Sequence, residues 1–245
     1  MIVPEYQRAI ANSRVIIMIN KSSLPRPRGR PRAFDRDAAL ATAGRTFWRL
    51  GYEGASIADL TEALGITAQS LYAAFKSKAD LYREALDWYQ REIGAYSVAA
   101  LRKPDVFEAI AGSLMEAAEE FARAGRPKGC MISTAVLTCA EENAPIAETV
   151  AGMRSGALAA YRARLDQGIA DGQLRPDTDI GALARYFGAI IQGMSVQARD
   201  GATADELAAV ARIALTELER HRAEPASRRK VRGETPASLA KRREK

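Results

Sequence analysis

The stretch that decides the fold is Ser56-Ile-Ala-Asp-Leu-Thr-Glu-Ala-Leu-Gly65-Ile-Thr-Ala-Gln-Ser-Leu-Tyr-Ala-Ala-Phe75. Ser56 and Asp59 have the spacing of a capping box, which predicts the start of a helix. Gly65 suits the left-handed conformation that ends a helix, and Thr67 can cap a second one. Leu60 and Leu64 in the first half, and Leu71 and Phe75 in the second, lie four residues apart, as in amphipathic helices. This pattern predicts a helix-turn-helix, whose second helix enters the major groove of DNA; the alternative is an ordinary pair of antiparallel helices.

Composition favours an all-α protein. The 245 residues are 47% hydrophobic, and alanine and leucine dominate while runs of β-branched residues are scarce. Aromatic residues make up only 7% of the chain, which argues against an aromatic-rich β-sandwich or barrel. No apolar run approaches the roughly 18 residues that span a bilayer. The apolar run at residues 15–19 is shorter than the core of a signal peptide. We therefore expect a cytoplasmic protein without a membrane segment.

Charge is distributed unevenly along the chain. Residues 1–36 and residues 226–245 each carry a net charge of +6, whereas residues 37–225 carry −6, for a total of +6. An acidic body with two basic ends predicts a globular protein whose affinity for phosphate is concentrated in terminal arms.

The N-terminal arm contains Pro27-Arg-Gly-Arg-Pro31-Arg32. Its core is similar to the AT-hook, an extended segment that lies in an A·T-rich minor groove. The two prolines keep the backbone extended, and arginine favours the negative potential of a narrow minor groove. We expect Arg28, Arg30 and Arg32 to contact DNA there. A solvated basic linker is the alternative.

Helices are expected on both sides of the central pair. One helix should run from Asp35 or Arg36 to Leu50. Lys76-Ser77-Lys78-Ala-Asp80 contains a second capping box and opens a helix that we expect to continue to Leu101. Its N-terminus, flanked by two lysines, is suited to bind phosphate. Proline and glycine signals divide the remainder into further helices. Their expected ranges are 104–124, 131–139, 145–169, 180–199 and 203–222.

Signals for catalysis or metal binding are weak. Cys130 and Cys139 form no metal motif and no disulfide framework. A pair of small buried thiols is one interpretation, and a thiol-based sensor is the other. The sequence has no Ser/His/Asp arrangement, no phosphate-binding glycine loop and no HExxH or CxxC motif. Glu119-Glu120 and Glu141-Glu142 are interpreted as solvated carboxylates. We expect no enzyme activity, no cofactor and no metal.

Residues 28–82 resemble the DNA-binding domain of the tetracycline-repressor (TetR) family of one-component transcription regulators. The matching motifs are Gly29-Arg-Pro31, Gly51-Tyr52, Ser56-Ile57, Leu64-Gly65-Ile66, Leu71-Tyr72-x-x-Phe75 and Lys76-Ser77-Lys78. The later helices are similar to the family's second domain only in number and length. The resemblance implies an N-terminal three-helix DNA-binding domain followed by a C-terminal helical domain for ligand binding and dimerisation. The expected divisions are an N-terminal extension (1–26), the DNA-binding domain with its arm (27–82), the second domain (83–223) and a disordered basic tail (224–245).

The resemblance implies a homodimer bound to a near-palindromic operator on double-stranded DNA. Gln69 can pair with adenine, and Ala68 can contact a thymine methyl group. Family members often carry a lysine or arginine near this position to read guanine, and this sequence has none there. The family's phosphate-contacting tyrosine corresponds to Tyr72. The residues assigned to DNA are Arg28, Arg30, Arg32, Ser56, Thr67, Ala68, Gln69, Ser70, Tyr72, Lys76 and Lys78.

The resemblance also implies a repressor that a small-molecule inducer releases from DNA. We expect the helix after Ser77 to transmit the effect of the inducer to the DNA-binding domain. This helix runs from the phosphate-binding N-terminus between the two lysines into the helical core. Helices 180–199 and 203–222 have broad apolar faces with small residues, and we expect them to form a four-helix dimer interface. A constitutive or architectural DNA-binding protein without an inducer is the alternative. The candidate ligand-binding residues, each with core packing as its alternative, are Trp88, Tyr89, Tyr96, Met115, Met131 and Tyr161.

Overall fold

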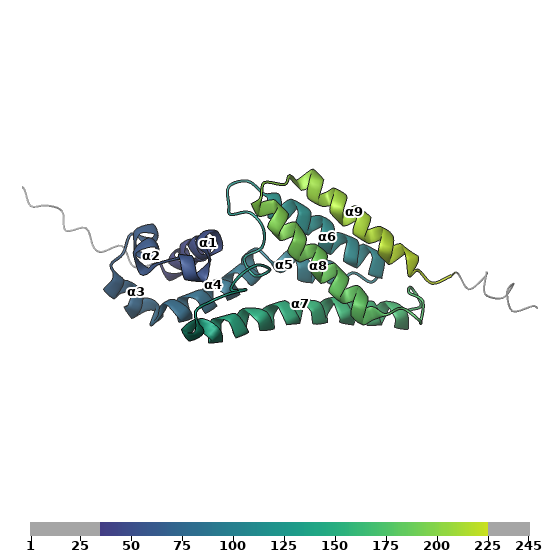
Figure 1. Ribbon diagram of the computed structural model, residues 1–245, viewed down its shortest axis with the longest axis horizontal. Helices are drawn as coiled ribbons and strands as arrows, with labels where there is room; N and C mark the ends of the chain where they lie inside the picture. The colour runs from purple at the N-terminus through teal and green to yellow at the C-terminus, as the bar shows by residue number, and fades with distance from the viewer. Residues whose placement is uncertain (1–34, 225–245) are drawn as a thin grey trace, which may run out of the picture. The chain divides into compact units, whose positions relative to one another are not determined.

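The computed structural model describes residues 35–224, and this part of the chain is built from α-helices without a β-strand (Figure 1). The all-α prediction is therefore confirmed. Residues 1–34 and 225–245 lie outside the described residues. The first of these two ranges contains the basic arm with Arg28, Arg30 and Arg32. The elements are α1 (Arg36–Gly54), α2 (Ile57–Leu64), α3 (Ala68–Phe75), α4 (Lys78–Glu92), α5 (Ala95–Leu101), α6 (Val106–Ala122), a 3₁₀ turn η1 (Glu141–Asn143), α7 (Ala144–Ala170), α8 (Ile180–Arg199) and α9 (Ala204–Arg220).

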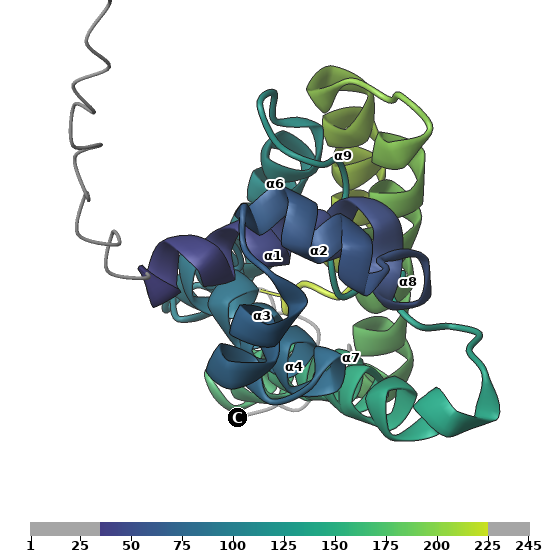
Figure 2. The ribbon, with the colours of Figure 1, turned by 90° about the vertical axis from the view of Figure 1, so that its left-hand side faces the viewer.

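The helix-turn-helix is present, with the caps that its sequence predicts. The Ser56 hydroxyl accepts a hydrogen bond of 3.1 Å from the Asp59 amide, and the Asp59 carboxylate accepts one of 2.8 Å from the Ser56 amide. Gly65 ends α2 in the left-handed conformation, with φ 65° and ψ 32°. Thr67 caps α3 by accepting from the Ser70 amide at 3.2 Å. These contacts fix the turn between the two helices, which lie beside each other in Figure 2.

A first hydrophobic core joins α1, α2, α3 and α4. Leu60 and Leu71, the inward-facing leucines of α2 and α3, are fully buried in it. Phe47 of α1 meets Tyr82 of α4 edge to face, with ring centroids 4.9 Å apart. Met131 and the start of α7 also contribute to this core. Helix α3 is thus held by the same packed unit that contains α4.

A second core is formed by α6, α7, α8 and α9. Ile110 and Leu114 of α6, Leu165 of α7 and Phe187 of α8 are fully buried within it. The two cores are connected by α4, α5 and the segment between α6 and α7. No helix within residues 35–224 combines the length and apolar character that crossing a membrane requires.

Two helix predictions were wrong. The helix that opens at Ser77 ends at Glu92, with Ile93 as its C-cap residue, because Gly94, a poor helix former, follows directly. Residues 95–101 form the separate helix α5. Residues 131–139 form turns rather than a helix, and Val136 has a positive φ of 48°. The Arg154 side chain donates to the Ala135 carbonyl at 2.8 Å and to the Ile132 carbonyl at 3.3 Å, so a side chain of α7 replaces the helical partners of this segment.

Candidate DNA interface and ligand cavity

The first turn of α3 presents its side chains to solvent. Thr67, Ala68, Gln69 and Ser70 are all exposed. The hydroxyls of Thr67 and Ser70 lie 3.0 Å apart, so part of their hydrogen-bonding capacity is used within the cap. The side chains of Gln69 and Ala68 make no such contact with the described residues and remain available to base edges. Tyr72, one turn further, is 45% exposed despite its aromatic ring.

The side chains proposed to contact phosphate differ in their exposure and in the contacts that they already make within the protein. The Ser56 hydroxyl donates to Asp59 at 2.5 Å, and this bond holds the pKa of the exposed Asp59 carboxyl below its usual value. Lys76 is exposed. The Lys78 ammonium lies 4.5 Å from the centroid of the Tyr52 ring, and partial burial lowers its pKa. Lys76 is therefore the more accessible of the two lysines.

A cavity of about 660 Å³ lies among α4, α5, α6, α7, α8 and the segment around Cys130. Of the six candidate ligand residues, Tyr89, Tyr96 and Tyr161 line it. The other three, Trp88, Met115 and Met131, are not in its wall. The volume falls within the range of about 300–1,000 Å³ that is typical of small-molecule sites.

The three candidates outside the wall have packing roles. Trp88 covers Gly44 of α1 so closely that a Cβ added there would lie 2.6 Å from the indole. Met131 is buried in the core of the first four helices. Met115 packs against the core of α6 to α9.

The tyrosines of the cavity are neutral phenols at physiological pH. Burial raises the pKa of Tyr161 to about 12, and the Tyr161 hydroxyl lies 2.6 Å from that of Ser113. Burial is also the main cause of the raised pKa values of Tyr89 and Tyr96. The phenols can therefore donate hydrogen bonds to a ligand but bring no negative charge.

Most of the lining residues were not assigned to the site from the sequence, and among them are Cys130, Arg102, Arg154 and Arg164. The first belongs to a segment next to residues that were predicted as a helix. The three arginines lie at positions where helical periodicity distinguishes only a buried face from an exposed one. The one signal in the sequence for these lining residues was the presence of arginine beside apolar positions of a helix.

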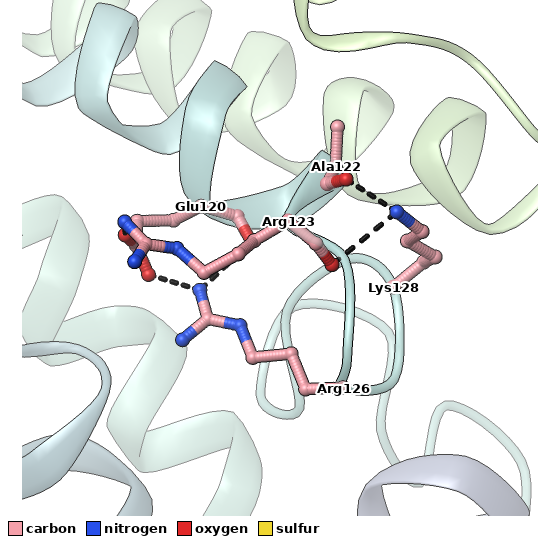
Figure 3. Close-up of polar contacts among 5 residues, drawn as sticks. All are labelled: Glu120, Ala122, Arg123, Arg126 and Lys128. Carbon is pink, nitrogen blue, oxygen red and sulfur yellow. Dashed lines mark hydrogen bonds and ion pairs between the residues drawn. The ribbon is translucent and has the colours of Figure 1, made fainter.

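The wall of the cavity also touches the helix-turn-helix unit. The Tyr89 ring packs edge to face on Trp48 of α1, with centroids 5.0 Å apart. The guanidinium of Arg126 lies 5.5 Å from the centroid of the same indole. Glu120 of α6 holds Arg126 by an ion pair, and it also pairs with Arg123 (Figure 3). Lys128 donates to the Arg123 carbonyl at 3.3 Å and to that of Ala122, so this turn caps the end of α6.

Comparison with known proteins agrees with this arrangement. Residues 39–85 match the family described as bacterial regulatory proteins, tetR family, and residues 109–223 match a tetracyclin repressor-like C-terminal domain. The HTH-type transcriptional repressor ComR of Escherichia coli (strain K12) is 38% identical over 186 residues, which cover 75% of this chain and 89% of ComR. The repressor BdcR of the same strain is 30% identical over 190 residues, covering 76% and 90%.

A solved structure of the TetR family regulator CifR, a cysteine mutant in complex with 26-base-pair operator DNA, is 42% identical to this chain. The two superpose with a TM-score of 0.73, and the alignment covers 77% of this chain and 98% of CifR. The matches include both the helix-turn-helix and the helical domain that holds the cavity. The chain therefore belongs to the tetR family of bacterial regulatory proteins, whose members are DNA-binding transcriptional regulators.

Proposed function

We propose that this protein is a transcriptional repressor that binds operator DNA as a homodimer and leaves it when a small molecule occupies the cavity. Two relatives, ComR and BdcR, are named as repressors, and CifR has been solved on operator DNA. We assign residues 27–82 to DNA binding and residues 83–223 to ligand binding and dimerisation.

The observation that carries the ligand response is the position of Tyr89. This side chain lines the cavity and packs against Trp48, which is buried in the core that holds the recognition helix. A ligand that moves Tyr89 must therefore also move α4 against α1. Because α4 begins at Lys78, directly after α3, such a movement changes the orientation of the recognition helix. A coupling free energy of about 1–3 kcal/mol is enough to shift the equilibrium towards the DNA-free state.

The DNA contacts are proposed from exposure and chemistry. Gln69 reads adenine, Ala68 contacts a thymine methyl group, and Thr67 and Ser70 support the start of α3. Phosphates are contacted by Tyr72, Ser56, Lys76 and Lys78. The Lys78 ammonium does so while it lies over the Tyr52 ring. Arg28, Arg30 and Arg32 of the arm would add minor-groove contacts.

Dimerisation is assigned to α8 and α9. Val196 of α8 is 45% exposed and Ile213 of α9 is 70% exposed, which leaves apolar surface on both helices. Gly188 does not serve this face, because a Cβ there would lie 2.3 Å from Leu158 inside the subunit. Gly193 has open space around it and can permit close approach of a partner helix. A dimer would place its two recognition helices at half-sites about 34–36 Å apart.

A matched pair of cavity variants tests the ligand response. Ala160 lines the cavity, whereas the exposed Ala159 next to it on α7 does not. Operator fragments are first selected from genomic DNA, and a small-molecule library is then screened for release of the protein from that DNA. We expect at least one compound to release the wild type and Ala159→Trp but not Ala160→Trp, which should still bind the operator. Release of Ala160→Trp at the same concentrations would place the response elsewhere, and operator binding that no compound reverses would favour the constitutive alternative.

A further inference from the structure

The charged residues of the cavity wall are all of one sign. Arg102, Arg154 and Arg164 line it, and no lysine, histidine, aspartate or glutamate of the described residues does. Within residues 35–224, none of these three arginines has a carboxylate oxygen within 4 Å. This is unusual in a body whose net charge is −6 over residues 37–225. The cavity therefore has uncompensated positive charge.

Arg164 carries the strongest argument, because it is only 8% exposed. Its Nε donates to the Lys103 carbonyl at 3.2 Å, and its Nη2 donates to the carbonyl of Pro104. Its Nη1 is buried and has no hydrogen-bond partner among the described residues. A buried guanidinium that meets only neutral acceptors is costly, and an anion beside it would offset that cost.

Arg102 lies at the same end of the cavity. It is the C-cap residue of α5 and directly precedes Lys103, whose carbonyl Arg164 binds. Its side chain is exposed and makes no hydrogen bond or ion pair with the described residues. Arg154 lies ten residues before Arg164 on α7, about 15 Å along the helix axis, where it holds the carbonyls of Ile132 and Ala135. Arg102 and Arg164, whose Nη1 has no partner among the described residues, therefore lie at one end of the cavity, away from Arg154.

The remainder of the wall is apolar or neutral. Tyr96, Phe121, Met153, Leu158 and Ile191 line it. The raised pKa values of the tyrosines keep them uncharged at neutral pH. Glu120, whose charge acts on Tyr96, is not in the wall and is already paired with Arg123 and Arg126 (Figure 3). No described residue of the wall carries a negative charge that would repel an anion near Arg102 and Arg164.

We infer that the cavity binds an organic carboxylate, with its carboxylate group between Arg102 and Arg164 and its apolar body along the aromatic wall. Arginine donates two parallel hydrogen bonds to a carboxylate, which suits this pair of guanidinium groups. The inference rests on the proposed function, because it gives the chemical class of the ligand for the same cavity.

The test uses displacement of a neutral dye by ligands that differ only in charge. N-phenyl-naphthylamine reports occupancy of the apolar cavity by its fluorescence, with Ala160→Trp and Ala159→Trp as the cavity controls. Two series of competitors share a body and differ in the head group: octanoate, octanamide and octylamine, and phenylbutanoate, phenylbutanamide and phenylbutylamine. We expect each acid to displace the dye at a concentration about tenfold lower than its amide, with the amine weakest.

Variants locate the carboxylate. Arg102→Gln, at an exposed position, should weaken the acids about tenfold and leave the amides unchanged. Arg164→Lys keeps the positive charge but cannot donate two parallel hydrogen bonds to a carboxylate. It should weaken binding of the acids less than Arg102→Gln does. Arg162→Gln is the control, because Arg162 is exposed on α7, pairs with Asp166 and does not line the cavity.

The outcomes separate this inference from the proposed function. If the dye binds the wild type and Ala159→Trp but not Ala160→Trp, the cavity is a ligand site. Amides or amines that then compete as well as the acids would overturn the carboxylate assignment alone. Equal weakening of acid and amide by Arg102→Gln would overturn that assignment too. A wild-type protein that binds neither dye nor competitor would overturn both proposals.

Discussion

Arg199, the last residue of α8, donates a hydrogen bond of 3.0 Å to the main-chain carbonyl of Trp48 in α1. The two residues are 151 positions apart in the sequence. Arg126 and Tyr89 contact the indole of the same tryptophan. Trp48 is thus contacted by side chains from α8, from α4 and from the segment after α6.

Replacing Arg199 with alanine should destabilise the protein, because the Trp48 carbonyl loses a charged donor. We expect a loss of about 1 kcal/mol in the free energy of unfolding, seen as a fall of about 2–4 °C in Tm. The control is Arg185→Ala, at an exposed position on the same helix. Equal Tm values for the two variants would show that the hydrogen bond to Trp48 contributes nothing measurable.

Lys76 combines a proposed phosphate contact with a strained backbone. Its φ of 64° and ψ of −55° form a γ-turn in which the Ser77 amide donates to the Phe75 carbonyl at 2.7 Å. Lys76→Gly should raise the free energy of unfolding by roughly 1 kcal/mol, because strain relief exceeds the added entropy of the unfolded chain. It should also weaken operator binding and lower the salt slope by about 0.9 for each phosphate that the protein no longer neutralises.

Lys76→Gln is the matched variant for that prediction, because it removes the charge and keeps a side chain at the strained position. We expect the same loss of DNA affinity without the gain in stability. Chemical denaturation and salt titrations of operator binding measure the two effects. A gain in stability for both variants would contradict the assignment of strain to the backbone.

Gln69→Ala should relax sequence discrimination more than it weakens binding. Gln69 is exposed in the first turn of α3, where its amide can reach an adenine edge. Competition among operators with single base-pair changes should show about 1–3 kcal/mol of lost discrimination at one position per half-site. Gln197→Ala, at an exposed position on α8, is the control. A uniform loss of affinity across all operators would instead assign Gln69 to the phosphate backbone.

Alkaline pH should destabilise the fold through its buried phenols. The pKa of Tyr161 is raised from 10.0 to about 12, so between these values the unfolded chain has lost a proton that the folded chain retains. The stabilising contribution is complete below pH 10 and is lost as the pH rises through about 12. Tyr161→Phe should make this fall in stability shallower when unfolding is followed by denaturant titration. Ser113→Ala removes the hydrogen bond but leaves the phenol, and should keep the wild-type slope.

Local signals in the sequence predicted the DNA-binding half of the fold. The capping box at Ser56, the N-cap at Ser77 and the glycine turn at Gly65 act within a few residues, so they can be recognised without tertiary information, although Ser77 lacks the reciprocal bond of a full capping box. The range 180–199 of α8 was likewise defined by its flanking residues. Amphipathic periodicity then identified the buried faces of these helices.

The cavity could not be derived in the same way, because a wall is made by residues from several helices. Tyr89 and Trp88 are neighbours on α4, yet only Tyr89 lines the cavity while Trp88 packs on Gly44. Periodicity distinguishes a buried face from an exposed one, but it cannot separate a packed face from one beside a void. The helix prediction for residues 131–139 failed for a related reason, since their carbonyls bond to Arg154, a partner outside the segment.

The break between α4 and α5 places part of the cavity wall on a helix separate from the one that packs on α1. Tyr96 and Leu101 of the cavity wall belong to α5, whereas Tyr89 of the wall and the residues that pack on α1 belong to α4. Substitutions in α5 can therefore alter which ligand is accepted without changing how α4 fits against the DNA-binding helices. Ligand preference and operator preference can consequently diverge independently in the course of evolution.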